Sequence, residues 1–413
     1  SLSTIQESWQ KKNHPELFVW DKQVRDFTIT EDLLERGPHG VWWDFMQDLS
    51  KENLKGKWVV NHGMLQTLIT AYGYLLHDFT PPDLKKAIVL YDRTAAEREG
   101  GAGKSILVDG LNEMRPYFWI DGKRIESQQR FLMDGYTEDK RLVVFSDIKS
   151  NWKLEDYYNY ITDGFTVEGK NQSSFVVPKQ KAPKICLNTN YTINAVNRSD
   201  RRRLHFVPIS QFYGVLQDTK QMTPKDVHGG WLLDETWTSE DWTAFYVTCI
   251  HCIHEYLKNS LVRFDDSVLA DRQLLAAAGN DETLLQILQD FIDEVVKSGG
   301  ECTKTQVLET FDKEMELEYC KDWKSNWKTR RFKEVAAGLG YQVNPGRDGG
   351  RYQRVINGKH EDCYVLVKSI QPGEAPVVSS TKPLEESIEE ARNIAFPQKD
   401  DGPFAEFLFD EEN

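Results

Sequence analysis

The chain has 413 residues, a length that predicts two or three domains, each able to bury its own core. Its formal net charge of −14 argues against a protein that coats nucleic acid with a broad basic surface, although a narrow basic channel inside an acidic shell is compatible with it. Six scattered cysteines are typical of reduced thiols, and the sequence shows neither a signal peptide nor an apolar run long enough to span a bilayer.

The first region, residues 1–80, is rich in Trp, Lys and Glu and is expected to be helical. Its most regular pattern is the amphipathic run MLQTLITAYGYLLH at 64–77, which stops before Pro81 and Pro82. We interpret 1–80 as a helical N-terminal collar that supports oligomerisation.

A central domain is predicted over residues 81–265. Its four apolar runs have strand character: AIVLY (87–91), RLVVF (141–145), KICL (184–187) and LHFVPI (204–209). The segments between them are long enough for crossover connections, which indicates an α/β fold. A single apolar helix over 242–258 is expected to close this domain.

A second folded unit is predicted over residues 275–370. Helix patterns at 282–297, 304–316 and 328–338 precede two strand-like runs, 341–343 and 351–355, on either side of a glycine-rich turn. Three helices and a β-hairpin indicate a winged-helix-like domain. The acidic segment 371–413 is expected to be disordered, and its residues Phe404, Phe407 and Phe409 could dock on a replication partner; a merely solubilising tail is the alternative.

The motif EREGGAGKS at 97–105 nearly matches the phosphate-binding pattern G-x-x-x-x-G-K-[ST], with Arg98 in place of the first glycine. In such a loop, backbone N–H groups and a helix N-terminus point at the phosphates. Lys104 would add charge at the phosphates, and the Ser105 hydroxyl would ligate Mg²⁺. ATP and Mg²⁺ are therefore the predicted cofactors, and a glycine-rich surface turn is the alternative. The rest of the cradle would be Gly100, Gly101, Ala102 and Gly103.

Polar residues follow two of the predicted strands. Asp147 comes after RLVVFS and could hold Mg²⁺ and orient water. Asn188 and Asn190 end the strand KICLNTN, where an amide could sense the γ-phosphate. Ordinary turns are the alternative interpretation of both strand ends.

Five motifs in order within about 85–205 resemble the superfamily 3 helicases of small DNA viruses, phages and mobile elements, above all the helicase part of primase-helicases. They read GGAGKS, VVFSDIK, DGFTVEGKNQSSF, PKICLNTNY and DRRRLHFVPI. The resemblance implies an AAA+ P-loop core in which Asp147 is the carboxylate on the Mg²⁺ side and Asn190 is the sensor. It implies that Lys170 and its neighbour Asn171 lie on a DNA-binding hairpin. It also implies that Arg202 or Arg203 reaches the nucleotide of a neighbouring subunit.

The sequence departs from this family pattern at two positions. Ser146 stands beside Asp147 where the family usually has a second acid, and Arg98 replaces the loop-opening glycine. Either departure could slow hydrolysis.

Two further motifs bear on binding. Cys249, His251, Cys252 and His254 (CIHCIH) suggest zinc, but residues three apart on a helix share a face, so the cysteines and the histidines point in different directions and core packing is the better interpretation. The segment WKSNWKTRR at 323–331 could be a nucleic-acid-binding helix or, equally, an aromatic core with a solvated basic edge.

These features together predict a ring-forming, ATP-dependent DNA helicase or translocase. It is expected to act as a homo-oligomer, a hexamer by resemblance, on single-stranded or forked DNA. Its setting would be replication of a phage or mobile element in the bacterial cytoplasm, without a membrane partner. A weak, nucleotide-switched DNA-binding or loader protein and an unrelated P-loop kinase remain open alternatives.

Overall fold

The computed structural model describes residues 18–21, 26–29, 37–78, 85–93, 101–125, 130–149, 152, 154–170, 173–193, 198–214, 216–217, 220–346, 352–356, 358–368 and 377–378. No helix among them is long and apolar enough to cross a bilayer.

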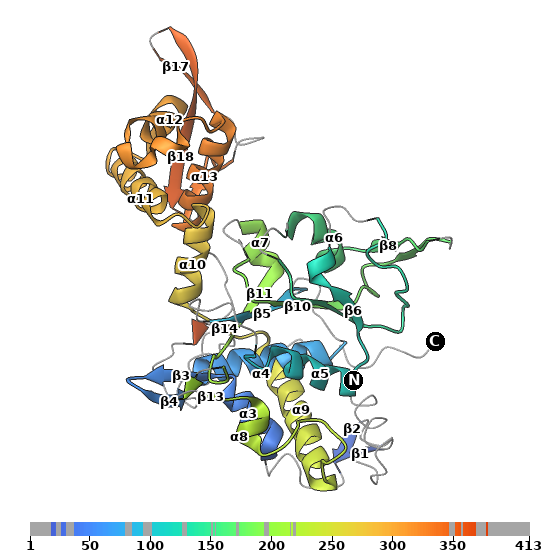
Figure 1. The fold of residues 1–413 in the computed structure, drawn as a ribbon. Helices are drawn as coiled ribbons and strands as arrows, with labels where there is room; N and C mark the ends of the chain where they lie inside the picture. Colours follow the sequence, from blue (N-terminus) through green and yellow to red (C-terminus); the bar gives the residue numbers. More distant parts are fainter. Residues whose placement is uncertain are drawn as a thin grey trace, which may run out of the picture.

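A five-stranded parallel sheet forms the centre of the molecule (Figure 1). Its order is β11-β5-β10-β7-β6. The four strands expected from the sequence are confirmed, and β6 joins them as an edge strand. The bounds are β5 (Ala87–Asp92), β6 (Phe118–Asp121), β7 (Leu142–Ser146), β10 (Lys184–Thr189) and β11 (Leu204–Ile209).

Both faces of the sheet are covered, which explains why its inner strands read as unbroken apolar runs. On β5, Ile88 and Leu90 enter one core and Ala87 and Val89 enter the other. The first core is shared with four helices: α3 (Gly40–Asp48), α4 (His62–Leu76), α5 (Lys104–Met114) and α9 (Ser239–Asn259). The second is covered by η2 (Leu154–Tyr157), α6 (Tyr158–Thr162) and the antiparallel hairpin of β8 (Phe165–Val167) and β9 (Phe175–Val177).

The expectation that residues 1–80 are helical is wrong in part. Besides α3 and α4, this region contains two antiparallel hairpins, β1 (Phe18–Asp21) with β2 (Asp26–Ile29) and β3 (Lys51–Leu54) with β4 (Lys57–Val60). Lys55 and Gly56 join β3 to β4 with φ of 55° and 86°. Positive φ at both central residues is the geometry of tight hairpin turns, and this local preference outweighs the helical composition.

Helices α4 and α9 pack in close contact through a glycine. A Cβ on Gly73 would lie 1.9 Å from the carbonyl oxygen of Cys252, so only glycine permits this approach. Cys249 and Cys252 are both fully buried in the core. Within the described part of the chain, no cluster of His, Cys, Asp and Glu has the arrangement of a metal site.

Helix α10 (Ser267–Ala277) connects the sheet domain to a separate C-terminal unit (Figure 1). That unit contains α11 (Glu282–Lys297), α12 (Lys304–Lys313), η3 (Met315–Cys320) and α13 (Ser325–Gly338). Its antiparallel sheet has the order β15-β18-β16, with β17 also paired to β18. The strands are β15 (Glu301–Thr303), β16 (Tyr341–Val343), β17 (Gln353–Ile356) and β18 (Lys359–Lys368).

The remaining elements are short. They are η1 (Gly122–Arg124), α7 (Arg198–Arg203), β12 (Leu216–Gln217), β13 (Lys220–Gln221), α8 (Pro224–His228), β14 (Arg263–Phe264) and β19 (Val377–Val378). The pairing of β19 with β14 departs from the disorder expected for 371–413. Phe404, Phe407 and Phe409 lie outside the described residues.

Candidate nucleotide site

The candidate site lies at the carboxyl edge of the parallel sheet, where the loops after β5, β7 and β10 meet. Ligands of open α/β sheets bind at this edge. By strand alternation, Asp92, Ser146 and Asn188 fall on the same face as the residues that pack against α5. The sheet therefore places three polar residues on the face that α5 packs against.

The glycine-rich loop leads directly into α5, which begins at Lys104. Gly103 precedes the helix with φ of 92°, and a Cβ there would lie 2.9 Å from Leu49 Cδ2. The positive φ favours glycine at this position, and any larger residue would also displace the Leu49 side chain. Ala102 is buried and Ser105 is exposed, while Gly101 also has a positive φ. Gly100 and Arg98 lie outside the described residues.

Lys104 forms an ion pair with Asp92, the last residue of β5. Lys104 Nζ lies 2.5 Å from Asp92 Oδ1, and both side chains are 6% exposed. Burial lowers the pKa of Lys104, and the carboxylates of Asp92 and Asp147 oppose this shift. The lysine that the motif assigns to phosphate therefore has a protein carboxylate as its partner, a role for Asp92 that the motif alone did not indicate.

Arg93 anchors the base of the loop. Its Nη1 lies 2.6 Å from Glu52 Oε1 on β3, and its Nε lies 3.2 Å from Asp266 Oδ1 at the start of α10. Its backbone N–H donates to the carbonyl of Ile209 at 3.1 Å. The loop therefore begins from a residue fixed by three separate elements.

Asp147 directly follows β7 and has φ of 54°, in the left-handed region. Its Oδ2 lies 3.0 Å from Nζ of Lys123, and both side chains are substantially exposed. A Cβ on Gly122 would lie 2.5 Å from the carbonyl oxygen of Ser146, so the glycine permits the close approach of η1 that brings Lys123 to the carboxylate. Lys123 was not predicted from the sequence; the GK pair after an apolar strand is its only local signal.

Of the two candidate sensor residues, Asn188 is buried and Asn190 is half-buried in the turn after β10. Asn188 Oδ1 has no hydrogen-bond partner among the residues that the structure describes. A buried amide oxygen without a partner is costly, and it points to a polar group that completes the site. Asn188 therefore joins Asn190 as a candidate for contact with the nucleotide or its water.

Arg202 and Arg203 end α7, immediately before β11, and their environments differ. The Arg203 guanidinium lies over the ring of Tyr158 at 4.0 Å. Arg202 is exposed. Arg203 therefore makes a contact within its own subunit, and Arg202 is available at the surface.

The hairpin expected around Lys170 is present as β8 and β9. Lys170 lies in the exposed turn between the two strands. Asn171 lies outside the described residues.

The basic residues of α13 mostly make internal contacts. Lys328 is 3% exposed, and its Nζ lies 2.6 Å from Asp312 Oδ1. Arg330 pairs with Glu334 on the same helix at 2.8 Å. Arg331 donates to the carbonyl of Ala277 at 3.1 Å. The WKSNWKTRR segment therefore stabilises the C-terminal unit and its junction with α10.

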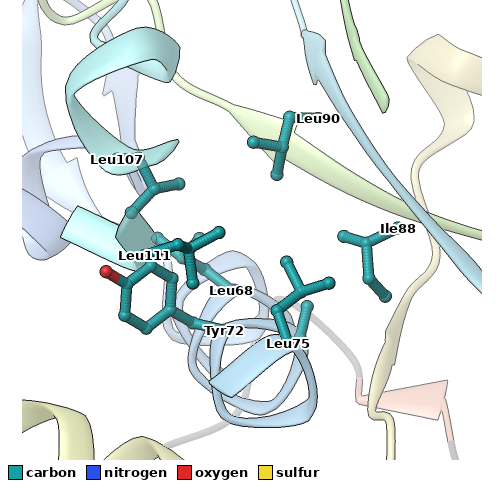
Figure 2. A pocket seen from close by; sticks show the side chains of 8 residues that line it. Leu68, Tyr72, Leu75, Ile88, Leu90, Leu107 and Leu111 are labelled. Atoms are coloured by element: carbon teal, nitrogen blue, oxygen red, sulfur yellow. The ribbon is translucent and has the colours of Figure 1, made fainter. Parts of the chain in front are cut away.

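A small cavity lies between α4, β5 and α5 (Figure 2). Leucine and isoleucine side chains from α4, β5 and α5 surround it, together with the Tyr72 ring. Its walls offer no charge to a phosphate, so it is a packing defect of the first core and not the nucleotide site.

No family model matches the chain, and no curated protein matches it. A solved structure of the NrS-1 C-terminal region, in its A form without ligand, aligns with 13% identity over 86% of this chain and 83% of that chain, at a TM-score of 0.36. A second structure of that region aligns with 14% identity at the same TM-score. A structure of JCV helicase with a bound small molecule aligns with 15% identity over 50% of this chain and 53% of that chain, at a TM-score of 0.29.

Proposed function

We propose that the chain is an ATP-dependent DNA helicase or translocase of the AAA+ type that works as a ring-forming homo-oligomer in replication. One observation carries the proposal. At a single edge of the parallel sheet lie the glycine-rich loop that opens α5, a carboxylate after β7, and an amide oxygen on β10 that has no hydrogen-bond partner within the described part of the chain. Phosphoryl transfer needs little more than such positioned charges and dipoles.

The strand order supports this proposal. β10 lies between β5, which leads into the loop, and β7, which leads into Asp147. Polar groups after β10 would therefore face the space between the phosphates and the metal, where the attacking water has to be oriented.

The residues present fit ATP and Mg²⁺. Lys104 and the first N–H groups of α5 would bind phosphate oxygens. Ser105 and Asp147 would supply oxygen ligands, which Mg²⁺ prefers. Bound Mg²⁺ would neutralise charge on the phosphates, and Asn188 or Asn190 would orient the water.

The DNA and oligomer parts of the proposal rest on exposed basic residues. Lys170 at the hairpin turn suits a sequence-independent contact with phosphate. Arg202 at the surface suits an arginine that acts on the nucleotide of a neighbouring subunit. The C-terminal unit fits a winged-helix-like domain, because its third helix is followed by a hairpin and the long strand β18 pairs with both β15 and β16. A hexamer is the ring size that the family resemblance suggests.

A weak, nucleotide-switched loader is the second candidate, and one observation favours it. Asp147 is the only acid at the end of β7, Ser146 stands beside it, and Lys123 already occupies the Asp147 carboxylate. A site with one acid and a competing cation would bind nucleotide and hydrolyse it slowly.

The test measures ATP hydrolysis with and without single-stranded DNA, beside light scattering for the oligomeric state. Lys104→Ala should abolish hydrolysis, but it also leaves the buried Asp92 carboxylate without its partner, so a lower Tm is expected and circular dichroism has to show that the variant is still folded. Lys258→Ala, which removes an exposed lysine on α9, should change neither hydrolysis nor Tm. Strand separation by a DNA-stimulated oligomer supports a helicase, and DNA-dependent assembly without strand separation supports a loader. A monomer whose rate of ATP hydrolysis does not change on addition of DNA would contradict both the helicase and the loader.

A further inference from the structure

Helix α10 lies across the carboxyl edge of the sheet at the two strands that matter most for the candidate site. Arg272 Nη1 donates to the carbonyl of Asp92 at 2.6 Å and lies 3.4 Å from that of Arg93. The next residue, Gln273, donates from Nε2 to the carbonyl of Ile193 at 3.4 Å. Two consecutive side chains of α10 therefore contact the segments that leave β5 and β10.

The start of α10 is fixed to the same strand end. Asp266 caps the helix by accepting from the backbone N–H of Val268 at 3.2 Å. The same carboxylate accepts from the Tyr91 hydroxyl at 2.5 Å and pairs with Arg93. It is 6% exposed, so these bonds form away from water, where they are strongest. The start of α10 is thus bonded directly to the base of the phosphate loop.

The other end of α10 is bonded to the C-terminal unit. Arg331 of α13 donates from Nη1 to the carbonyls of Ala277 at 3.1 Å and Ala276 at 3.4 Å. A guanidinium at the negative end of a helix is favourable because it satisfies carbonyls that lack partners within the helix. Its ring contact with Trp327, at 4.5 Å, fixes its position on α13.

We infer that Arg272 is a positioning residue of the nucleotide site, and that α10 makes the site and the C-terminal unit respond to each other. The inference rests on the proposed function. Arg272 binds the backbone of Asp92, whose carboxylate binds Lys104. A bound nucleotide that draws Lys104 toward its phosphates weakens the ion pair between Lys104 and Asp92. Because Arg272 is bonded to the backbone of Asp92, α10 transmits this change to its other end, where Arg331 binds. By linkage, a change at Arg331 must alter nucleotide affinity in return.

The experiment uses the full chain and measures steady-state hydrolysis together with binding of a non-hydrolysable Mg²⁺–ATP analogue. Arg272→Ala should lower kcat/KM roughly 10-fold, since it removes a charge-assisted hydrogen bond to the loop base. Arg272→Lys, which keeps a donor in place, should recover part of the loss. Asp271→Asn, an exposed neighbour on α10, is the control and should match the wild type.

Arg331 supplies the decisive variant, because the structure places it on α13 and not at the candidate site. Arg331→Ala should change analogue affinity or kcat by about 3-fold or more, Arg331→Lys should reverse part of this, and Arg330→Ala, on the same helix, should have no effect. The double variant with Arg272→Ala should be no worse than Arg272→Ala alone. The analogue should also slow amide exchange at the end of α10 in the wild type but not in Arg272→Ala.

The outcomes separate this inference from the proposed function. If the wild type binds and hydrolyses ATP but Arg331→Ala changes neither nucleotide parameters nor exchange, the coupling through α10 is refuted and the proposed function stands. If the two substitutions are additive, Arg331 acts independently of Arg272, and the inference is equally refuted. A wild type that binds no nucleotide overturns both.

Discussion

Lys104 and Asp92 form a buried ion pair between the first residue of α5 and the last residue of β5. The bond joins the two ends of the glycine-rich loop. Nucleotide phosphates would compete with Asp92 for the same ammonium group. The partner of Lys104 should therefore change when the site fills.

Asp92→Asn should lower the stability of the folded protein and increase the stabilisation that a bound nucleotide provides. Removal of one partner of a buried pair leaves a charge without compensation and costs about 3–5 kcal/mol. Phosphates would compensate Lys104 again, so the rise in Tm on addition of Mg²⁺–ATP analogue should be larger in Asp92→Asn than in the wild type. Thermal unfolding with and without the analogue measures this. Equal rises in Tm would show that phosphates do not reach Lys104.

Arg202→Ala and Arg203→Ala should have different effects. Loss of Arg203 removes the contact with Tyr158 and should lower the unfolding free energy by about 1–2 kcal/mol. Loss of Arg202 should leave stability and nucleotide binding unchanged but abolish hydrolysis, since a guanidinium supplied by another subunit is worth roughly 10³–10⁵ in rate. Mixing Arg202→Ala with Lys104→Ala subunits should restore some activity, because some interfaces then have both groups intact. Failure to recover at every mixing ratio would contradict a shared site.

Lys123→Ala should lower the Mg²⁺ concentration needed for half-maximal hydrolysis. Lys123 and Mg²⁺ would compete for the Asp147 carboxylate, and the lysine is one competing cation. The shift should stay below about 5-fold, because exposed ion pairs are weak. Arg124→Ala is the matched control, since Arg124 lies on the same turn and pairs with Asp121. A Mg²⁺ dependence identical in the two variants would mean that Mg²⁺ does not bind Asp147.

His205 should make the fold sensitive to acid. Burial lowers the pKa of His205 in β11 to about 3, and Lys86 and Arg263 add to this effect. The unfolded chain takes up a proton near the ordinary value of 6.5, whereas the folded chain does not until about pH 3. The free energy of unfolding is therefore unaffected by His205 above pH 6.5. Between pH 6.5 and about pH 3 it falls as the pH drops, by up to about 1.4 kcal/mol per pH unit.

His205→Phe should flatten this slope relative to the wild type. Urea unfolding between pH 4 and 7 measures it, with the exposed His254→Gln as the control. Parallel curves for the wild type and His205→Phe would show that His205 titrates normally in the fold.

The parts of the fold that could be predicted from the sequence are those with a strong local signal. The strands β5, β7, β10 and β11 are buried on both faces of the sheet, so each appears in the sequence as an unbroken apolar run that predicts a buried strand. Helix α11 was predicted with its observed bounds because its apolar period is regular and Asp281 caps its start. The loop at 101–103 that leads into α5 was predicted from its glycines.

The rest depends on contacts between residues far apart in the chain. Arg272 meets the carbonyl of Asp92 across 180 positions, and neither residue belongs to a motif that suggests the other. Helix α10 was missed although Asp266 caps it, because its weak amphipathic pattern resembles a linker. Lys123 reaches Asp147 only through the pairing of β6 with β7, and β6 is an edge strand with a half-exposed pattern.

The left-handed backbone of Asp147 decides how its chemistry can be probed. Asp and Asn adopt such a conformation far more readily than residues without a short polar side chain. Alanine would strain the turn by about 1–2 kcal/mol at the point where η1 also packs closely, so an inactive Asp147→Ala protein would mix a distorted loop with a missing carboxylate. Asparagine removes the charge and tolerates the turn. Asp147→Asn is therefore the substitution that isolates the electrostatic contribution of this side chain.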